Sequence, residues 1–349
     1  MDSYTATQAR MADLDGRIRA EPSRFRVLTG ERPTGRLHLG HYFGTLSERV
    51  ALQSRGVEIF LVLADYQVIT DRDTARDVGV NVREAVLDYL AAGLDPAATT
   101  IFPHSAVPAL NQLLLPFLSL VTEAELHRNP TVKAETAASG RALSALMLTY
   151  PVHQAADILF CKGNLVPVGK DNLPHVEMTR TVARRFNERF GALFPEPEPF
   201  VTASPEVPGV DGRKMSKSYG NAIALGMGDD ETAAVIRRAT TDGGRRITFD
   251  PERRPGVAAL LTTASLCTGT APEHIAEAIG DRGSSELKRV ATEAVNERFA
   301  EHRRRRAALA DDADVVDGAL AAGIERANRI ADQTLEEVLD RMGMRYLPA

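Results

Sequence analysis

The sequence predicts an α/β protein in which a doubly wound parallel sheet is followed by a C-terminal bundle of α-helices. Two observations support this prediction. From residue 25 to about residue 187, short apolar runs alternate with longer helical stretches, a pattern typical of a buried parallel sheet with helices on both faces. Beyond about residue 229 the β signal nearly disappears, and apolar residues recur at helical spacing, as in "ALAAGIERANRIADQTLEEVLDRMG".

The elements of the predicted sheet follow in chain order. Strands are expected in "FRVLTG", "VEIFLVLAD", "TTIFPHS" and "NLVPVG". Helices are expected in "LHLGHYFGTLSERVALQSRG", "NVREAVLDYLAAGLDP" and "KDNLPHVEMTRTVARRFNERFG". Gly93 followed by Pro96 predicts the end of the second helix. This alternation is that of a Rossmann-like fold.

The stretch from Pro195 to Gly212 is rich in proline and glycine and predicts a boundary or an exposed crossing. The expected organisation is an N-terminal extension (1–24), a Rossmann domain (25–205), a loop and linker (206–228), a helical domain (229–343) and a short tail (344–349).

Composition limits the possible functions of the 349-residue chain. The formal net charge of −5 argues against wholesale coating of nucleic acid, although it allows a local basic surface. No apolar run approaches the roughly 18 residues that span a bilayer, and the polar N-terminus lacks the apolar core of a signal peptide. Cys161 and Cys267 stand far apart, which fits a reducing cytoplasm and predicts no metal site, zinc included.

The segment "TGERPTGRLHLGH" lies where the first strand should end and a helix begin, which is where doubly wound sheets bind ligands. Gly30 and Gly35 allow a tight turn, and Gly40 would let a flat base approach the backbone. His38 and His41 could both donate hydrogen bonds to phosphate oxygens beside the positive end of the helix dipole. A capped structural turn is the alternative, while a metal pair lacks a third ligand at suitable spacing.

A second segment, "GRKMSKSYGN" (212–221), holds Arg213, Lys214 and Lys217 among small and hydroxyl residues. Such a basic loop is suited to close over a polyphosphate, although a solvated loop is the alternative. The HxGH and KMSKS sequences together resemble the paired signatures of class I aminoacyl-tRNA synthetases. "TYPVHQAADIL", "LVPVGKDNLPHVEMTRTVARRFN" and "TG-x-x-PTG" are similar to the bacterial tryptophanyl-tRNA synthetases, and the resemblance extends over residues 25 to 343.

This resemblance implies an enzyme that activates L-tryptophan with ATP and Mg²⁺ and transfers it to tRNA(Trp). It implies that the Rossmann domain is catalytic, that the helical domain reads the anticodon and that the protein is a homodimer. His38, His41, Lys214 and Lys217 would share the charge that builds on the leaving pyrophosphate. The ATP site implied by the resemblance comprises Arg32, Pro33, Thr34, His38, Gly40, His41, Gly169, Lys170, Asp171, Lys214, Met215, Ser216, Lys217 and Ser218.

The amino-acid pocket implied by the resemblance comprises Asp157, Gln154, Gln67 and Tyr150. Asp157 would accept the indole N–H, and a substrate without that group would leave a buried acceptor unpaired at a cost of about 1–3 kcal/mol. The alternative is a helix carboxylate paired to a lysine or arginine. Gly169 and Asp171 would hold the ribose, or alternatively form a turn and a helix cap.

Several positions depart from the commonest bacterial pattern, namely Arg32, Gln67, Gln154, Lys170 and Asn172. Together they resemble the auxiliary type of bacterial tryptophanyl-tRNA synthetase. The indole pocket is therefore expected to be unusually polar, and inhibition by the tryptophan mimic indolmycin is expected to be weak.

Three alternatives stay open. Tyr150, Gln154 and Asp157 match the Y-x-x-x-Q-x-x-D helix of tyrosyl-tRNA synthetases, although Leu28 and Thr29 stand where those enzymes carry a tyrosine. A ligase such as pantothenate synthetase shares HxGH, but the long helical C-terminus argues against it. A non-catalytic tRNA-binding paralogue would not need both intact motifs.

Only part of the "RRRR" run at 303–306 could face RNA, because four consecutive residues point all round a helix.

Overall fold

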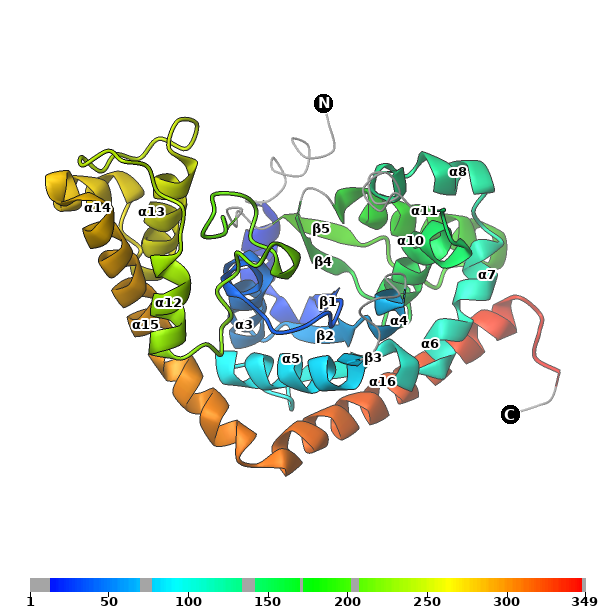
Figure 1. Ribbon diagram of the computed structural model, residues 1–349. Coiled ribbons are helices and arrows are strands. Elements are labelled where there is room, and N and C mark those ends of the chain that lie inside the picture. The colour runs from blue at the N-terminus through cyan, green and yellow to red at the C-terminus, as the bar shows by residue number, and fades with distance from the viewer. Residues whose placement is uncertain (1–12, 70–76, 134–141, 170–171, 202–206, 347–349) are drawn as a thin grey trace.

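A computed structural model describes residues 13–69, 77–133, 142–169, 172–201 and 207–346. Five parallel strands form one sheet in the order β3-β2-β1-β4-β5 (Figure 1). Their bounds are β1 Arg26–Glu31, β2 Glu58–Leu63, β3 Thr99–Pro103, β4 Leu165–Val168 and β5 Glu198–Val201. The chain changes direction across the sheet between β1 and β4, so the carboxyl ends of these two strands border the crevice where such folds bind ligands.

Helices cover both faces of this sheet. Along β2, Phe60 and Val62 pack in one core with α6 (Pro108–Gln112), α7 (Leu114–Leu118), α8 (Glu123–Arg128), α10 (Ala145–Leu159) and α11 (Leu173–Phe190). Leu61 and Leu63 pack in another core, with α5 (Val78–Ala92). Successive strand residues point to opposite faces, so the continuous apolar run buries both. The predicted doubly wound sheet is confirmed.

The fifth strand corrects one sequence expectation. The proline-rich stretch from Pro195 to Gly212 was expected to be a boundary or crossing, yet β5 lies inside it and pairs with β4. Pro199 cannot donate a ladder hydrogen bond, and β5 is an edge strand, where this loss is tolerated. Prolines therefore masked the strand pattern.

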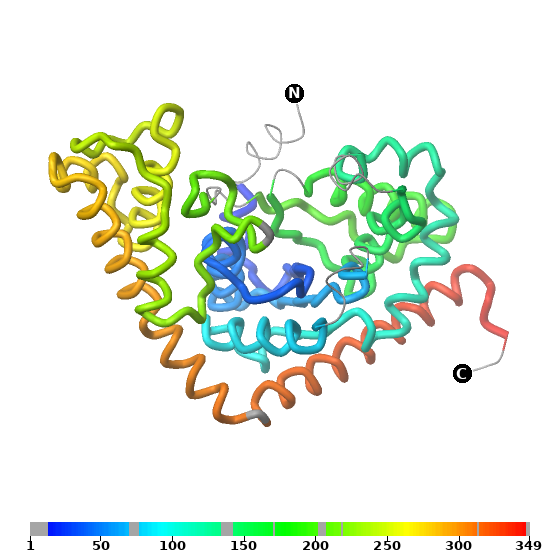
Figure 2. The backbone as a smooth tube through the Cα atoms, viewed as in Figure 1, coloured from blue at the N-terminus to red at the C-terminus, as the bar shows by residue number. Residues whose placement is uncertain are grey.

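The predicted C-terminal helices are also confirmed. They are α12 (Asp229–Arg237), α13 (Pro255–Thr268), α14 (Pro272–Ile279), α15 (Gly283–Ala310) and α16 (Ala313–Arg341). Figure 2 shows α16 running back beneath the sheet domain, toward the side opposite α14. There it packs on β3 so closely that a Cβ on Gly323 would lie 1.9 Å from the carbonyl oxygen of Ile101. Helix α16 therefore lies against the sheet, although it follows the other C-terminal helices in the chain. The predicted domain boundaries stay a prediction.

The arginine run at 303–306 contributes mainly to packing between α15 and its neighbours. Arg306 Nε donates to Asp88 on α5 at 2.8 Å, and Arg303 pairs with Asp229 at the start of α12. Arg304 and Arg305 are exposed, and both pair with Glu301 on their own helix. None of the helices in the described ranges is both long and apolar enough to cross a membrane.

The described ranges also contain short elements. They are η1 (Pro22–Arg24), α2 (Leu39–His41), the π-helical η2 (Tyr42–Leu46), α3 (Ser47–Ser54), α4 (Asp65–Val68), η4 (His104–Ala106), η6 (Lys217–Tyr219) and η7 (Gly280–Arg282). The predicted helix end at Gly93 is confirmed, since Gly93 caps α5 with φ +107°.

Candidate active site

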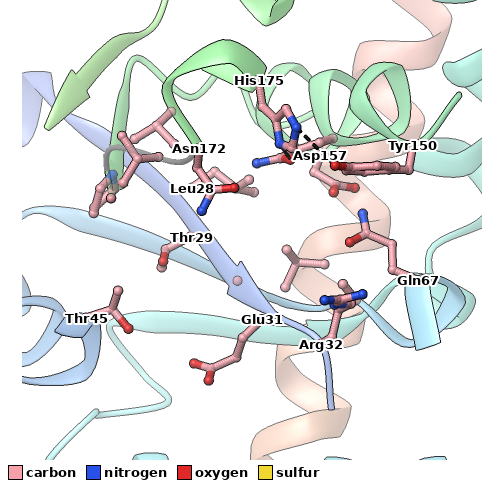
Figure 3. A pocket seen from close by; sticks show the side chains of 18 of the residues that line it. Leu28, Thr29, Glu31, Arg32, Thr45, Gln67, Tyr150, Asp157, Asn172 and His175 are labelled. Atoms are coloured by element: carbon pink, nitrogen blue, oxygen red, sulfur yellow. Dashed lines mark hydrogen bonds between the residues drawn. The ribbon is translucent and has the colours of Figure 1, made fainter. Parts of the chain in front are cut away.

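A cavity of about 330 Å³ opens at the carboxyl ends of β1 and β4. This volume is at the lower end of the roughly 300–1,000 Å³ typical of small-molecule sites. In Figure 3, Glu31 and Arg32 border one side, and Tyr150, Asp157 and His175 border the other. The cavity therefore lies between the end of the first strand and the helix pair α10 and α11.

A buried ion pair forms the wall at the end of β1. Arg49 on α3 donates through Nη1 to Glu31 Oε1 at 2.5 Å and through Nε to Thr29 Oγ1 at 3.0 Å. Burial alone would raise the pKa of Glu31, but the positive charge of Arg49 and the hydrogen bond from Arg49 hold that pKa at about 2. The site therefore contains a fixed carboxylate whose Oε2 lies 3.8 Å from His41 Nε2.

The two histidines of the first motif cap the start of α2. His38 is the N-cap residue, and its Nδ1 accepts the N–H of Gly40 at 3.1 Å. The Nδ1 of His41 accepts the N–H of His38, also at 3.1 Å. Because a backbone N–H can only donate, both Nδ1 atoms must be unprotonated, so each neutral ring carries its hydrogen on Nε2. The cap thus fixes both rings as Nε2–H donors.

Both imidazoles are held neutral at physiological pH. Burial, with contributions from His41 and Lys217, lowers the pKa of His38 to about 3. Burial also lowers the pKa of His41, against the opposing effect of Glu31. Neutral donors at a helix N-terminus suit a site that must be assembled before a polyphosphate arrives.

Gly40 is required here by a close contact. A Cβ on Gly40 would lie 2.9 Å from His38 Cε1 and 3.8 Å from the Cβ of Met215 in the second motif. A side chain would therefore displace the capping ring. The expected approach of a base to Gly40 stays a prediction.

The second motif lies directly against the first. Leu39 N–H donates to Ile223 at 3.0 Å, and Leu225 N–H donates to Leu37 at 2.9 Å, so the two segments form a short antiparallel bridge. Within the loop, Asn221 Oδ1 accepts the Ser216 N–H at 2.8 Å. These bonds hold the KMSKS segment beside the start of α2.

The two lysines of that segment differ in their surroundings. Lys217 is half-buried, and its Cδ lies 3.4 Å from the position of a Cβ on Gly35. Burial lowers the pKa of Lys217, while Glu31 and Asp88 oppose that shift. Lys214 is exposed. Of the two, only Lys217 is packed against the first motif.

The remaining residues expected at an ATP site have varied positions. Arg32 and Gly169 line the cavity. Pro33 is buried, whereas Thr34 is exposed in the turn before α2. In the second motif, Met215 is buried, Ser216 precedes η6 and Ser218 lies within it. Lys170 and Asp171 lie outside the described residues.

The residues expected to bind an amino acid all line the cavity, namely Asp157, Gln154, Gln67 and Tyr150. His175, on α11, links two of them. Its Nε2 lies 3.2 Å from the Tyr150 hydroxyl, and its Nδ1 lies 2.7 Å from Gln154 Oε1. Since an amide oxygen can only accept, Nδ1 carries the hydrogen and the Tyr150 hydroxyl donates to Nε2. This chain of bonds fixes the Gln154 amide with its oxygen turned to His175.

Reasoning from sequence missed several polar residues of this site, namely Glu31, Arg49, His104, His153 and His175. Glu31 and His104 each stand at or just after the carboxyl end of a strand, a position that could have singled them out. Arg49 and His153 lie within helices and become site residues only through packing.

Comparison with known proteins identifies the family. A family model for class I tRNA synthetases (W and Y) matches residues 21–300. The chain belongs to this synthetase family. The Tryptophan--tRNA ligase of Lactococcus lactis is 39% identical over 334 residues, which cover 92% of this synthetase and 98% of that relative. The Tryptophan--tRNA ligase of Treponema pallidum is 39% identical and covers 93% and 98%, respectively.

Solved structures agree. Tryptophanyl-tRNA synthetase from Campylobacter jejuni, complexed with ADP and tryptophan, matches this synthetase with a TM-score of 0.80 and 29% identity, covering 91% of this chain and all of that one. A tyrosyl-tRNA synthetase from Archaeoglobus fulgidus has a TM-score of 0.64 at 21% identity, which shows the shared fold alone. The prediction of a class I tryptophan–tRNA ligase is confirmed, and the tyrosine alternative is not favoured.

Proposed function

We propose that the cavity and the two motifs carry out both steps of tryptophan transfer to tRNA(Trp), with ATP and Mg²⁺ as co-substrates. One observation carries the assignment of roles: the Nε2–H donors of His38 and His41 and the Lys217 ammonium gather at the start of α2, beside a cavity that contains Asp157. If the ATP phosphates bind at the two motifs and the indole of tryptophan binds near Asp157, the carboxylate of tryptophan lies between these two sites.

In the first step, a carboxylate oxygen of tryptophan attacks the α-phosphorus of ATP. A C–O–P bond forms, the bond from the α-phosphorus to the bridging oxygen breaks, and pyrophosphate leaves with the electron pair. His38, His41 and Lys217 donate to the leaving oxygens, and no side chain acts as a nucleophile. Lys214 joins them if the loop closes further. Mg²⁺ enters on the phosphates as part of the substrate and neutralises charge there.

Neutral imidazoles suit this step. Because each Nδ1 is occupied by a backbone N–H, the Nε2–H groups need no reorientation when pyrophosphate forms. Glu31 keeps a negative charge 3.8 Å from His41 Nε2, and this charge opposes the lowering of the His41 pKa by burial.

Selection of tryptophan rests on Asp157, as the acceptor of the indole N–H. Gln67, Tyr150 and Gln154 supply further polar walls, and Gly169 borders the ribose. Lys170, Asp171 and Ser218 stay candidates for the ATP site on the family resemblance alone. In the second step, a terminal ribose hydroxyl of tRNA takes the acyl group from the adenylate, and AMP leaves.

The helical part, residues 229–343, is proposed to bind the anticodon, and the protein is proposed to work as a homodimer in the cytoplasm. The Campylobacter jejuni enzyme with bound ADP and tryptophan supports the two small-molecule subsites.

The test is amino-acid-dependent exchange of pyrophosphate into ATP by the purified protein, followed by aminoacylation of tRNA(Trp). Exchange with tryptophan and not with tyrosine is expected. Strong exchange with tyrosine would contradict the role of Asp157. Absence of exchange with either amino acid, from a protein that still binds tRNA(Trp), would favour a non-catalytic paralogue.

A further inference from the structure

A pair of buried histidines lies directly behind Asp157. His104 follows the end of β3 and is fully buried, and His153 and Asp157 are 4% and 2% exposed on α10. Nε2 of His104 lies 2.8 Å from Oδ1 of Asp157, and the two imidazole centroids are 4.5 Å apart. No other His, Cys, Asp and Glu side chains in the described ranges form so tight a group of three.

The protonation of His153 follows from its neighbour Asn111. The Asn111 amide nitrogen donates to the backbone carbonyls of His104 and Val107 at 2.7 and 2.9 Å. Its oxygen must therefore face His153 Nε2, 2.8 Å away, and accept a hydrogen from it. Burial lowers the pKa of His153, so this ring is neutral with a bare Nδ1.

A metal ion explains this cluster less well than a direct contact does. Zinc bonds of about 2.0–2.2 Å in a tetrahedron hold neighbouring ligand atoms roughly 3.3 Å apart. The 2.8 Å separation of His104 Nε2 and Asp157 Oδ1 is shorter, and it is the separation of a charge-assisted hydrogen bond. The alignment is nevertheless poor, because neither atom has a hydrogen bond of good geometry in the described residues.

The surroundings hold His104 in place. Asp65 on α4 accepts the N–H of Ser105 at 3.1 Å and also pairs with the Ser105 hydroxyl. The ring of Tyr66 stacks over His104 at 6.4 Å. With Asn111 bonded to its carbonyl, His104 is fixed by α4 on one side and α6 on the other.

We propose that His104 determines substrate specificity by binding one oxygen of Asp157 and leaving the other to accept the indole N–H of tryptophan. The inference rests on the proposed role of Asp157 and extends it. A buried carboxylate needs a partner, and His104 is the imidazole in contact with it. Catalytic hydrogen bonds are often poorly aligned before the ligand binds, so the misaligned contact is completed when the indole enters. His104 is a positioning residue, since it acts through Asp157.

The experiment compares the wild type with His104→Leu, His104→Gln and the control His127→Leu, whose histidine is half exposed on α8. Pyrophosphate exchange is measured with tryptophan and with its benzothiophene isostere, in which sulfur replaces the indole N–H. His104→Leu is expected to lower the preference for tryptophan by about 10- to 100-fold, mainly through KM, because the aligned acceptor is lost. His104→Gln retains a donor and should restore much of that preference, whereas His127→Leu should leave it unchanged.

If His104→Leu lowers pyrophosphate exchange equally with tryptophan and with the isostere, the proposal is overturned, because a merely structural role would impair both substrates alike. Since the chain contains no tryptophan, fluorescence of the bound substrate gives its affinity directly if the folded Leu variant turns over too slowly for kinetics. A preference that disappears on dialysis against EDTA and returns with Zn²⁺ would overturn it in favour of a metal site. If the wild-type protein exchanges no pyrophosphate into ATP with either compound, the proposed function itself is refuted.

Discussion

The side chain of Lys217 lies along the backbone of Gly35, with Cδ 3.4 Å and Nζ 3.6 Å from the place of a Cβ on that glycine. Gly35 has φ +142°, a conformation that favours glycine, so both the turn and the contact depend on the missing side chain. The two motifs, far apart in sequence, therefore form one structural unit at the start of α2. The antiparallel bridge between residues 37–39 and 223–225 reinforces it.

Replacing Lys217 by Met is expected to reduce kcat for pyrophosphate exchange by about 10²–10³-fold, as is typical when one preorganised donor to a developing charge is lost. Lys214→Met is the matched change in the same loop, and its effect should be smaller because Lys214 is exposed. Steady-state exchange kinetics at saturating ATP provide the comparison. A larger loss for Lys214→Met would mean that the loop rearranges on substrate binding.

Gly40→Ala is expected to raise the KM for ATP about tenfold or more. Its Cβ would lie 2.9 Å from His38 Cε1 and push the capping ring out of place. Gly44→Ala is the control, since a Cβ there meets no atom within 4 Å. Similar kinetics for both variants would show that the His38 cap does not organise the ATP site.

Arg49→Met should reduce the free energy of unfolding by about 3–5 kcal/mol, because it leaves the buried Glu31 carboxylate without its partner. The double variant Glu31→Leu with Arg49→Met should recover much of this loss, since no buried charge then remains. Urea unfolding measures both. If Arg49→Met unfolds like the exposed-site variant Arg19→Met, the ion pair contributes little.

Stability should fall as the pH is lowered from about 6.5 to 5. The folded pKa of His38 is about 3, against an ordinary value of 6.5, so in this window the unfolded chain binds a proton that the folded chain does not. Unfolding therefore takes up protons, and acid favours it. His38→Asn, which keeps a cap acceptor, should flatten this part of the stability–pH curve, whereas His274→Asn on the exposed face of α14 should not. Parallel curves for both variants and the wild type would contradict the burial of a neutral His38.

Arg306→Ala is expected to destabilise the protein by about 2–4 kcal/mol, because it removes a partner of Asp88, which is 1% exposed. Arg304→Ala, at an exposed position paired with Glu301 on the same helix, should change stability by less than about 0.5 kcal/mol. Chemical unfolding separates the two. Equal effects would mean that the arginine run does not join α15 to α5.

The sequence predicts most of the sheet because buried parallel strands appear as uninterrupted apolar runs, as β2 does. It misses β5, where Pro199 and acidic neighbours hide a strand that is paired on one side only. The helix after β1 was expected to begin at Leu37, whereas His38 precedes the helix as its cap. A cap of this kind depends on ring orientation, which spacing alone does not determine.

For the cavity, the family resemblance indicates Asp157, Gln154, Gln67 and Tyr150, and the structure places all four around one space. Their roles stay predictions. His104 and His153 belong to no local motif, since one follows a strand and the other lies inside a helix. The two histidines lie close together only because the sheet places the end of β3 beside α10. A sequence pattern does not show this proximity.

The return of α16 to the sheet has a consequence for biosynthesis. β3 lies at the edge of the sheet, and α16 packs against it through the close approach of Gly323 to Ile101. Arg326 on the same helix bonds to Glu58, 268 residues earlier in the chain. A ribosome releases β3 long before α16, so the nascent sheet waits with one edge uncovered while the intervening helices are made. Until α16 is translated, this edge offers unpaired backbone groups to any other extended chain.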